Sequence, residues 1–189
     1  KKDKGYWHLM KSFVRVRQYI KDAGLVFIGH MGEMESEIRA MAKESGFESD
    51  ILFLGYRENP FKYVSKCDLY VCTSVCEGFP NALVEAMACG TPVLSADCKA
   101  GPREILCESP DFKEINETLF ADYGVLVPAP CETPDFDLQN IGDKEIMTAG
   151  GICRLLTDEG RRRKYGELAS VRAGEFSMEK YFERLAQII

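Results

Sequence analysis

The sequence has few of the residue groupings that hold metal ions. It contains two histidines, His8 and His30, and no Cys-x-x-Cys pair, although it has eight cysteines. The two cysteines closest together are Cys72 and Cys76. Metal-ligating cysteines usually come in tight pairs, and a chain of 189 residues is too long to be a disulfide-stapled miniature. We therefore expect no metal site and eight reduced thiols that pack as small apolar side chains in a reducing cytoplasm.

Positive charge and long apolar runs are also scarce. The chain carries 24 Lys and Arg against 30 Asp and Glu, a formal charge of −6, whereas nucleic-acid binding depends on clustered positive charge. No apolar run approaches the ~20 residues that a membrane-spanning helix needs, and no signal peptide is visible. These absences predict a soluble, cytoplasmic protein that binds no nucleic acid, with at most a peripheral membrane association of its parent protein.

Short apolar segments alternate with amphipathic segments of helical periodicity along most of the chain. The apolar segments, which we interpret as strands, are residues 25–28, 51–54, 68–72, 92–95 and 125–127. Strands that are apolar throughout are buried on both faces, as in parallel sheets built from βαβ units. We therefore predict an α/β fold, a Rossmann-like parallel sheet flanked by helices, in a single domain over residues 1–189.

In an open parallel sheet, ligands bind in the loops that follow the carboxyl ends of the strands. The loops in that position are residues 29–33, 55–60, 73–80 and 96–103 and the turn after residue 127. The polar or proline-rich stretches 107–116 and 128–143 are expected to be irregular loops. The helix expected at 143–157 contains Gly150 and Gly151, which weaken it by about 1–2 kcal/mol relative to alanine.

Residues 77–93 carry the most informative motif of the chain, EGFPNALVEAMACGTPV. A helix is expected to begin at Pro80 or Asn81, because proline is favoured at a first helical position. The amides of Asn81, Ala82 and Leu83 would then be free donors at the positive end of the helix dipole. Such a helix start is a ready binding site for a phosphate group.

Two carboxylates flank this helix start, and one of them, Glu77, lies in the loop beside Gly78, which lets a ligand approach the backbone closely. Glu85 lies about one and a half turns into the helix, and its side chain leans back toward the helix start. A carboxylate is repelled by phosphate, so its natural partners here are the hydroxyls of a diol. An anionic centre with hydroxyls on both sides describes a nucleotide sugar. On these residues alone, it stays equally open that Glu85 only complements the helix dipole and that Glu77 is a surface residue.

This motif, with seven residues between Glu77 and Glu85, closely resembles the signature of the retaining GT-B glycosyltransferases of family 4. The resemblance covers nearly the whole chain in the order of that family. The other matching segments are residues 4–5, 28–29, 53–56, 101–105, 123–128 and 176–180. The resemblance implies that the chain is the C-terminal, donor-binding domain of such an enzyme, truncated at its N-terminus. The acceptor-binding N-terminal domain would then be absent from this chain.

The resemblance also implies a role for each matching residue. Glu77 would be the catalytic residue at the donor sugar, Glu85 would bind the ribose hydroxyls, and Lys4 would neutralise the diphosphate. The implied backbone contacts are those of Gly78, Phe79, Pro80 and Asn81 with the sugar, of Ala82 and Leu83 with the distal phosphate, and of Leu54, Gly55 and Tyr56 with the base. Gly29 would let the nucleotide come close. The loop after Gly29 is one residue longer between its glycines than the family pattern, and the family's phosphate-binding arginine would precede residue 1.

The implied activity is retaining transfer of a hexose from a nucleotide-diphosphate sugar in the synthesis of a cell-surface polysaccharide or glycan. UDP is the default nucleotide because it is the commonest in the family. Lys4 and the helix start after Pro80 would stabilise the leaving diphosphate, so we expect no cofactor and no metal. The isolated chain should transfer no sugar, because half of the active cleft is absent. The alternatives are a non-catalytic nucleotide-binding or interaction domain and a sugar-nucleotide epimerase of similar architecture.

Overall fold

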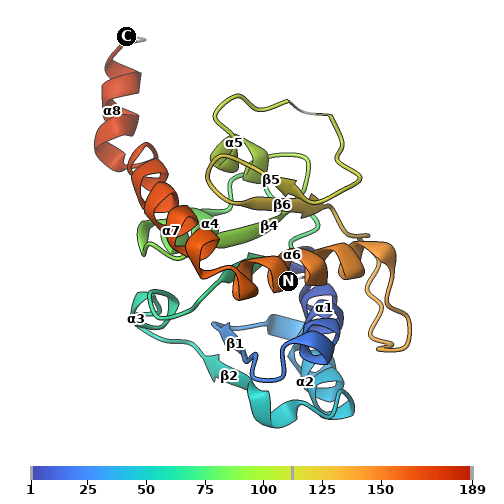
Figure 1. The fold of residues 1–189 in the computed structure, drawn as a ribbon. Helices are drawn as coiled ribbons and strands as arrows, with labels where there is room; N and C mark the ends of the chain where they lie inside the picture. The colour runs from blue at the N-terminus through green and yellow to red at the C-terminus, as the bar shows by residue number, and fades with distance from the viewer. Residues whose placement is uncertain (1, 112, 188–189) are drawn as a thin grey trace.

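The computed structural model describes residues 2–111 and 113–187, which form helices packed around strands (Figure 1). The helices are α1 (Tyr6–Tyr19), α2 (Glu35–Glu44), α3 (Phe61–Val64), α4 (Asn81–Ala88), α5 (Pro102–Leu106), α6 (Asp143–Thr157), α7 (Glu159–Gly174) and α8 (Met178–Ala186). The strands are β1 (Leu25–Ile28), β2 (Ile51–Gly55), β3 (Tyr70–Cys72), β4 (Val93–Asp97), β5 (Leu119–Phe120) and β6 (Val125–Pro128). The short 3₁₀ helices are η1 (Lys2–Lys4), η2 (Gly32–Met34) and η3 (Glu48–Asp50).

The strands form the parallel, helix-flanked α/β architecture that the sequence predicts, with two differences of detail. β1 pairs with β2, and a second hydrogen-bonded set has the order β3, β4, β6, β5. Every pairing is parallel except that of β5 with β6. The expected single sheet is therefore interrupted between β1 and β3 in the described residues. The edge strand β5 is not predicted by the sequence pattern, because its two residues are too few to show a periodicity.

β4 and β6 form the centre of the core because helices cover both of their faces. Successive side chains of a strand point to opposite faces, so each strand contributes to two clusters. The cluster on the side of α1 and α6 includes Leu94, Val125, Val127 and Leu155, and the cluster on the side of α4, α5 and α7 includes Val93, Leu126, Leu83 and Ala169. This burial on both faces explains why the sequence shows continuous apolar runs rather than alternation.

β1 and β2 are covered less completely than β4 and β6. Phe27 of β1 is buried in the cluster that α1 and α2 contribute to. On the same two strands, Val26 is 37% exposed and Leu52 is 53% exposed. The expectation that these strands are buried on both faces is therefore wrong for the described residues, because the helices of this part of the chain cover one face only.

Gly151 lets α6 lie close against the sheet. A Cβ atom at this position would lie 2.8 Å from Leu94 Cδ1 and 3.5 Å from Val127 Cγ1. α6 nevertheless runs unbroken over 15 residues. The expectation of a weakened helix considers helix propensity alone and leaves out this packing contact. Helix propensity is a weak preference, and tertiary packing overrides it here.

His8, a buried residue of α1, connects this helix to the start of α6. Its Nδ1 atom lies 2.5 Å from Glu145 Oε1, and its Nε2 atom lies 2.9 Å from the carbonyl oxygen of Cys131. Burial disfavours the charged form of Glu145. The hydrogen bond with His8, together with the backbone hydrogen bond, outweighs this effect and lowers the pKa of the Glu145 carboxyl.

Lys11, one turn further along α1, holds the irregular segment between β6 and α6. Its side chain is almost completely buried, and its ammonium donates to Asp135 Oδ2 at 2.7 Å and to the carbonyl oxygen of Asn140 at 2.8 Å. These contacts satisfy a charge that would otherwise be very unfavourable inside the protein. The polar stretch that the sequence predicts as a loop is thus tied to the core by two side chains of one helix.

Replacing His8 by alanine should lower the free energy of unfolding by about 2 kcal/mol, because the buried Glu145 carboxylate loses one of its hydrogen-bond partners. The amide of Gly142 still donates to Glu145, which limits the loss. Urea unfolding followed by circular dichroism measures this difference. The matched control is His30→Ala at an exposed loop position, where the change should stay within about 0.5 kcal/mol. Equal effects of the two substitutions would contradict the structural role of His8.

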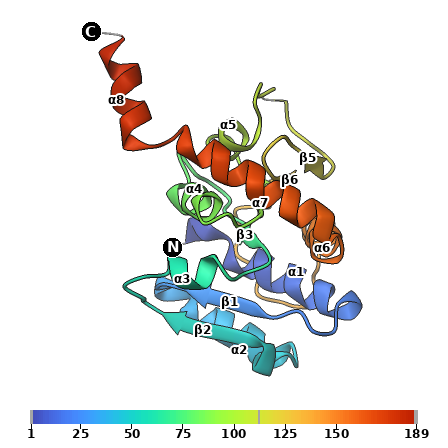
Figure 2. The same cartoon turned by 60° about the vertical axis from the view of Figure 1, so that its left-hand side comes forward.

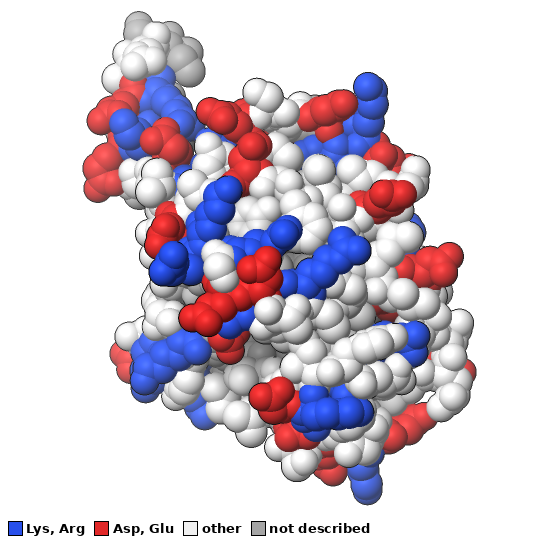
Figure 3. Space-filling view, viewed as in Figure 1, with Lys and Arg blue, Asp and Glu red and all other residues white. Residues whose placement is uncertain are grey.

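The outer surface carries charges of both signs, and the C-terminal helix projects from the body. α8 extends away from the other helices in two views (Figures 1 and 2). Lys and Arg side chains are interspersed with Asp and Glu on the face drawn in Figure 3. No helix within residues 2–111 and 113–187 is long and apolar enough to cross a membrane.

Candidate functional site

The segment before α1 and the loop after β3 are joined by hydrogen bonds to backbone carbonyl oxygens. The Val75 amide donates to the carbonyl oxygen of Asp3 at 2.8 Å, and Thr73 Oγ1 donates to that of Gly5 at 3.0 Å. Gly5 has a φ of 59°, and a Cβ atom there would lie 2.2 Å from the Thr73 carbonyl oxygen. Glycine is therefore required for this close approach, which places Lys4 beside the loop.

Lys4, Ser74 and Glu77 form a hydrogen-bonded cluster at this junction. Lys4 Nζ donates to Glu77 Oε1 at 2.6 Å, and Ser74 Oγ donates to the same oxygen at 2.7 Å. The side chain of Glu77 is 12% exposed and that of Lys4 is 39% exposed. The structure thus brings together two residues that the sequence analysis assigns to one site. Ser74 was not singled out from the sequence, although its position in a loop at a strand end is a signal that could have found it.

Lys4 is held in its charged form. Partial burial disfavours the charge, but the hydrogen bond to Glu77 and the negative charge of that carboxylate outweigh burial and raise the pKa of the Lys4 ammonium. An ammonium group has three donors, and Glu77 uses one of them. Lys4 can therefore donate to an anion in the same loop while it remains paired with Glu77.

α4 begins at Asn81, and Pro80 is the N-cap, one position before the first helical residue. The Asn81 amide donates to the carbonyl oxygen of Phe79 at 3.0 Å, and the Leu83 amide donates to that of Pro80 at 2.9 Å. The Ala82 amide has no hydrogen-bond acceptor within the described part of the chain. The expectation of three free amides is therefore wrong for Asn81 and Leu83, because the tight turn at Pro80 uses them. Ala82 supplies the free donor at the positive end of the helix.

Two other parts of the chain support the loop before α4. Gly101 has a φ of 84°, and a Cβ atom there would lie 2.5 Å from Pro80 Cδ and 2.7 Å from the carbonyl oxygen of Gly78. The ring of Phe79 packs against Phe176, with 5.5 Å between the ring centroids. The loop backbone is thus set by its neighbours, which favours a preformed binding site.

Glu85 lies on the exposed side of α4. It borders a groove that is also lined by Ile28, the last residue of β1. Its carboxylate has no ion-pair or hydrogen-bond partner among the described residues. A negative charge complements the helix dipole mainly within the first turn, and the first turn of α4 contains no acidic residue. This position favours a role toward a ligand at the carboxyl ends of the strands.

A glycine lies at the carboxyl end of each of the paired strands β1 and β2: Gly29 follows β1, and Gly55 is the last residue of β2. The Gly29 amide donates to the carbonyl oxygen of Gly55 at 2.8 Å, and both residues have positive φ angles, 102° and 65°. Beyond them, the exposed ring of Tyr56 is parallel to that of His30, with 6.2 Å between the centroids and 8° between the planes. His30 is not singled out in the sequence analysis, although this residue lies in the loop 29–33 that follows a predicted strand. Leu54, whose backbone the family resemblance places at the base, lies half-buried in β2.

The described residues include no group of three or more His, Cys, Asp or Glu side chains placed to hold a metal ion. All eight cysteines have free thiols. Cys72 Sγ donates to Ser74 Oγ at 3.3 Å, which links one thiol to the cluster around Glu77. Burial raises the pKa of the Cys98 thiol to about 12, so this thiol stays protonated and unreactive at neutral pH.

Comparison with known sequences identifies a family and several longer relatives. The family model described as glycosyl transferases group 1 matches residues 1–115. The chain is 31% identical over 192 residues to an uncharacterised glycosyltransferase of Methanocaldococcus jannaschii, covering 98% of this chain and 46% of the relative. A second relative is the N-acetylgalactosamine-N,N'-diacetylbacillosaminyl-diphospho-undecaprenol 4-alpha-N-acetylgalactosaminyltransferase of Campylobacter jejuni. The chain is 31% identical to it over 180 residues, which cover 94% of this chain and 41% of the relative. The chain thus spans less than half the length of these curated relatives.

Comparison with solved structures identifies the same architecture. The fold is similar to that of HepE from Anabaena in its crystal structure in complex with UDP, with a TM-score of 0.75 and 22% identity. The match covers 100% of this chain and 45% of the other. This likeness concerns the fold, and it confirms the predicted parallel sheet flanked by helices as part of a larger architecture.

Proposed function

Because the chain belongs to the group 1 glycosyl transferases, we propose that it is the donor-binding domain of a retaining enzyme that transfers a hexose from a UDP-sugar to a cell-surface glycan. The family and the GT-B fold agree with the resemblance seen in the sequence. UDP as the nucleotide is supported by the complex of the Anabaena protein, and a glycan acceptor by the Campylobacter relative. We place the enzyme in the cytoplasm, with at most a peripheral membrane contact of the parent protein.

The observation that carries this proposal is the cluster of Lys4, Glu77 and Ser74 beside the start of α4. It combines an ammonium group, a nearly buried carboxylate and the free amide of Ala82 in one loop region. A diphosphate requires positive charge and N–H donors, and sugar hydroxyls require acceptors. A nucleotide-diphosphate sugar matches both requirements at once.

The proposed mechanism depends on charge that develops on the leaving group. Breaking the bond between the anomeric carbon and the diphosphate oxygen leaves the bonding electron pair on that oxygen. The Lys4 ammonium and the Ala82 amide would stabilise this charge, at about 3–4 kcal/mol for each well-placed donor. Glu77 would accept hydrogen bonds from the sugar hydroxyls and position the ring. We propose metal-independent transfer, because Lys4 and the helix amide supply the positive charge that a cation would otherwise provide.

We further propose that the acceptor site belongs to a domain outside residues 1–189. The relatives are more than twice as long as the part that this chain matches. Residues 1–189 alone should therefore bind UDP weakly and transfer no sugar, because the second wall of the cleft is missing. A transfer assay with radiolabelled UDP-sugars that compares this chain with the longer protein checks the expectation. Measurable transfer by residues 1–189 alone would contradict it.

A titration of UDP into the Glu85→Gln variant tests the donor site most directly. Loss of the carboxylate should weaken binding by about 1–3 kcal/mol, the usual contribution of hydrogen bonds to a charged partner. The loss should be smaller for 2′-deoxy-UDP, which lacks one of the two ribose hydroxyls. Isothermal titration calorimetry with both nucleotides gives the affinities, and thermal unfolding shows whether the fold is intact.

The matched control is Glu44→Gln, at an exposed position in the last turn of α2. This variant should bind both nucleotides as the parent does. Unchanged affinity of Glu85→Gln for both nucleotides would remove Glu85 from the site. UDP binding without any sugar transfer by the longer protein would instead favour the non-catalytic alternative.

A further inference from the structure

The loop before α4, residues 78–80, carries free hydrogen-bond donors. Within the described part of the chain, the amides of Gly78 and Phe79 have no hydrogen-bond acceptor. The backbone hydrogen bonds of the loop are those that the carbonyl oxygens of Phe79 and Pro80 accept from α4. The direction of the two free amides is therefore set by the side chains that pack against the loop.

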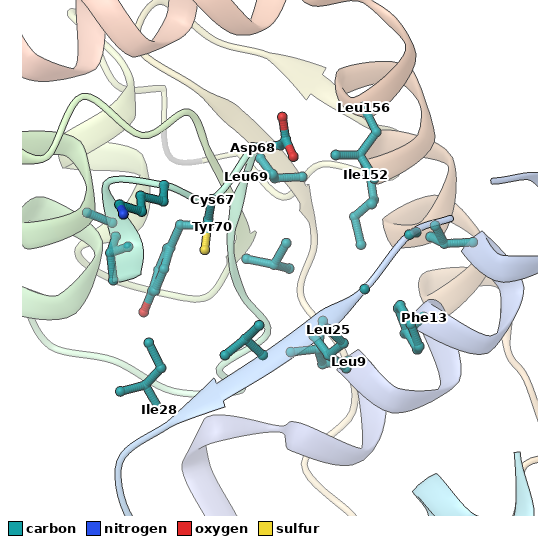
Figure 4. A pocket seen from close by; sticks show the side chains of 18 of the residues that line it. Leu9, Phe13, Leu25, Ile28, Cys67, Asp68, Leu69, Tyr70, Ile152 and Leu156 are labelled. Atoms are coloured by element: carbon teal, nitrogen blue, oxygen red, sulfur yellow. The ribbon is translucent and has the colours of Figure 1, made fainter. Parts of the chain in front are cut away.

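α4 meets two different environments. On one side, Ala82 and Glu85 line a groove of about 590 Å³ that is bordered by side chains of β1 and β3 (Figure 4). Residues 78–80 do not line this groove. On another side of α4, Leu83 is buried in the cluster that α5 and α7 contribute to. The contacts of the loop before α4 with distant parts of the chain also lie on the side of α5 and α7.

Phe176, which follows the end of α7, covers one side of Phe79. The ring centroids lie 5.5 Å apart, and the ring planes are inclined by 59°. Tilted aromatic pairs at this separation are favourable, because the edge of one ring approaches the face of the other. Phe79 is nevertheless 43% exposed. Much of its ring thus faces solvent, and Phe176 is the aromatic ring that restrains it.

Arg172, in the last turn of α7, holds Phe176 in turn. Its guanidinium lies over the ring of Phe176, 5.1 Å from the centroid, and over that of Tyr123, 4.9 Å from the centroid. The same group donates to the carbonyl oxygens of Ile105 at 3.0 Å and Glu104 at 2.8 Å, both in α5. A planar guanidinium can stack on rings and donate at its edge at the same time, which a lysine ammonium cannot.

α5 completes the support of the loop from the opposite end. Its N-cap, Gly101, lies so close to the loop that a Cβ atom there would be 2.5 Å from Pro80 Cδ. The loop before α4 is therefore held between Gly101 and Phe176, and Arg172 connects these two contacts through α5. The contacts form a closed circuit that starts and ends at the loop.

We propose that Phe176 and Arg172 are positioning residues of the donor site, which hold the free amides of Gly78 and Phe79 in the direction of the donor sugar. Both act through the ring of Phe79 and do not contact the ligand themselves. The proposal rests on the proposed function, because that function places the donor sugar at this loop. A nucleotide without a sugar and without a distal phosphate should not depend on either residue.

Hydrogen exchange at single-residue resolution in the longer protein, without a nucleotide, measures the order of the loop. The amides of Asn81 and Leu83 donate to carbonyl oxygens of the loop, so their exchange reports its opening. Phe176→Leu should speed the exchange of both amides by at least about tenfold. Phe176→Tyr keeps the ring and should exchange as the parent does. Unchanged exchange in Phe176→Leu would overturn the proposal.

Two comparisons separate positioning from general packing. Phe120→Leu removes another half-buried ring with an arginine above it, Arg161 at 4.5 Å from the centroid, and should leave the exchange of the loop unchanged. The Tyr70 amide, which donates to a carbonyl oxygen outside the loop, should exchange at the same rate in Phe176→Leu and the parent. Equal acceleration of the Tyr70 amide and the loop amides would overturn the proposal, because Phe176 would then only stabilise the fold.

Nucleotide affinity shows the consequence for the donor. Phe176→Leu should bind UMP as the parent does, because UMP has neither the distal phosphate nor the sugar. Among UDP-glucose, UDP-galactose and their N-acetylhexosamine counterparts, the one that the parent binds best should bind about tenfold more weakly, the contribution of one or two hydrogen bonds. Equal weakening of UMP, or no weakening of the UDP-sugar, would overturn the proposal. Failure of the parent itself to bind these nucleotides would instead contradict the proposed function.

Discussion

Replacing Lys4 by methionine in the longer enzyme should lower kcat by about 100- to 1000-fold, which corresponds to about 3–4 kcal/mol of transition-state stabilisation. The ammonium is the group with a full positive charge beside Glu77, and the proposed reaction places new negative charge on the diphosphate. Methionine keeps most of the length and volume of the side chain but removes the charge. Initial rates at saturating UDP-sugar measure the effect, and KM should change much less than kcat.

Lys43→Met, at an exposed position of α2, is the matched control and should leave kcat unchanged. The Glu77→Gln variant separates two roles of Lys4. If Lys4 only holds Glu77 in place, the two substitutions should have equal effects, and the double variant should lose no further activity. If Lys4 acts on the diphosphate, the double variant should be slower than either single variant. A kcat of Lys4→Met within twofold of the parent would contradict both roles.

The architecture could be predicted from the sequence because the physical signal for it is local. The apolar runs at residues 25–28 and 51–54 are each short, continuous and followed by a glycine, which indicates parallel strands between helices. The pattern does not show which strand pairs with which. The interruption between β1 and β3 and the exposure of Val26 depend on which segments lie side by side. The composition of a strand is the same whether or not another segment pairs with it or covers it.

The location of the candidate site could be predicted from the sequence, but the contacts between residues far apart in the chain could not. The motif at residues 77–93 lies where a strand ends and a helix begins, so its position follows from the local pattern. The ion pair of Lys4 with Glu77 joins residues 73 positions apart, and the contact of His8 with Glu145 spans 137 positions. No local pattern encodes such pairs. The amide of Leu83 likewise finds its partner through the ψ angle of Pro80, 84°, because the proline ring fixes φ but leaves ψ open.

Gly5→Ala should lower the free energy of unfolding by more than about 3 kcal/mol, since this glycine combines two requirements that few positions share. Its φ of 59° is left-handed, and a Cβ atom would lie 2.2 Å from the Thr73 carbonyl oxygen and 3.2 Å from its carbon. Both neighbours are backbone atoms, so either η1 or the loop after β3 has to move. Urea unfolding of the variant measures the loss.

Gly46→Ala separates the two requirements. Gly46 also has a positive φ, 75°, but a Cβ atom there would meet no other atom within 4 Å. This control should lose only about 1–2 kcal/mol, the strain of the left-handed conformation. Gly5→Ala should in addition weaken UDP binding, because the movement separates Lys4 from Glu77, whereas Gly46→Ala should bind UDP as the parent does. Equal losses of stability and unchanged UDP affinity in both variants would mean that the contact of Gly5 with Thr73 neither sets the packing of the chain start nor places Lys4 at the donor site.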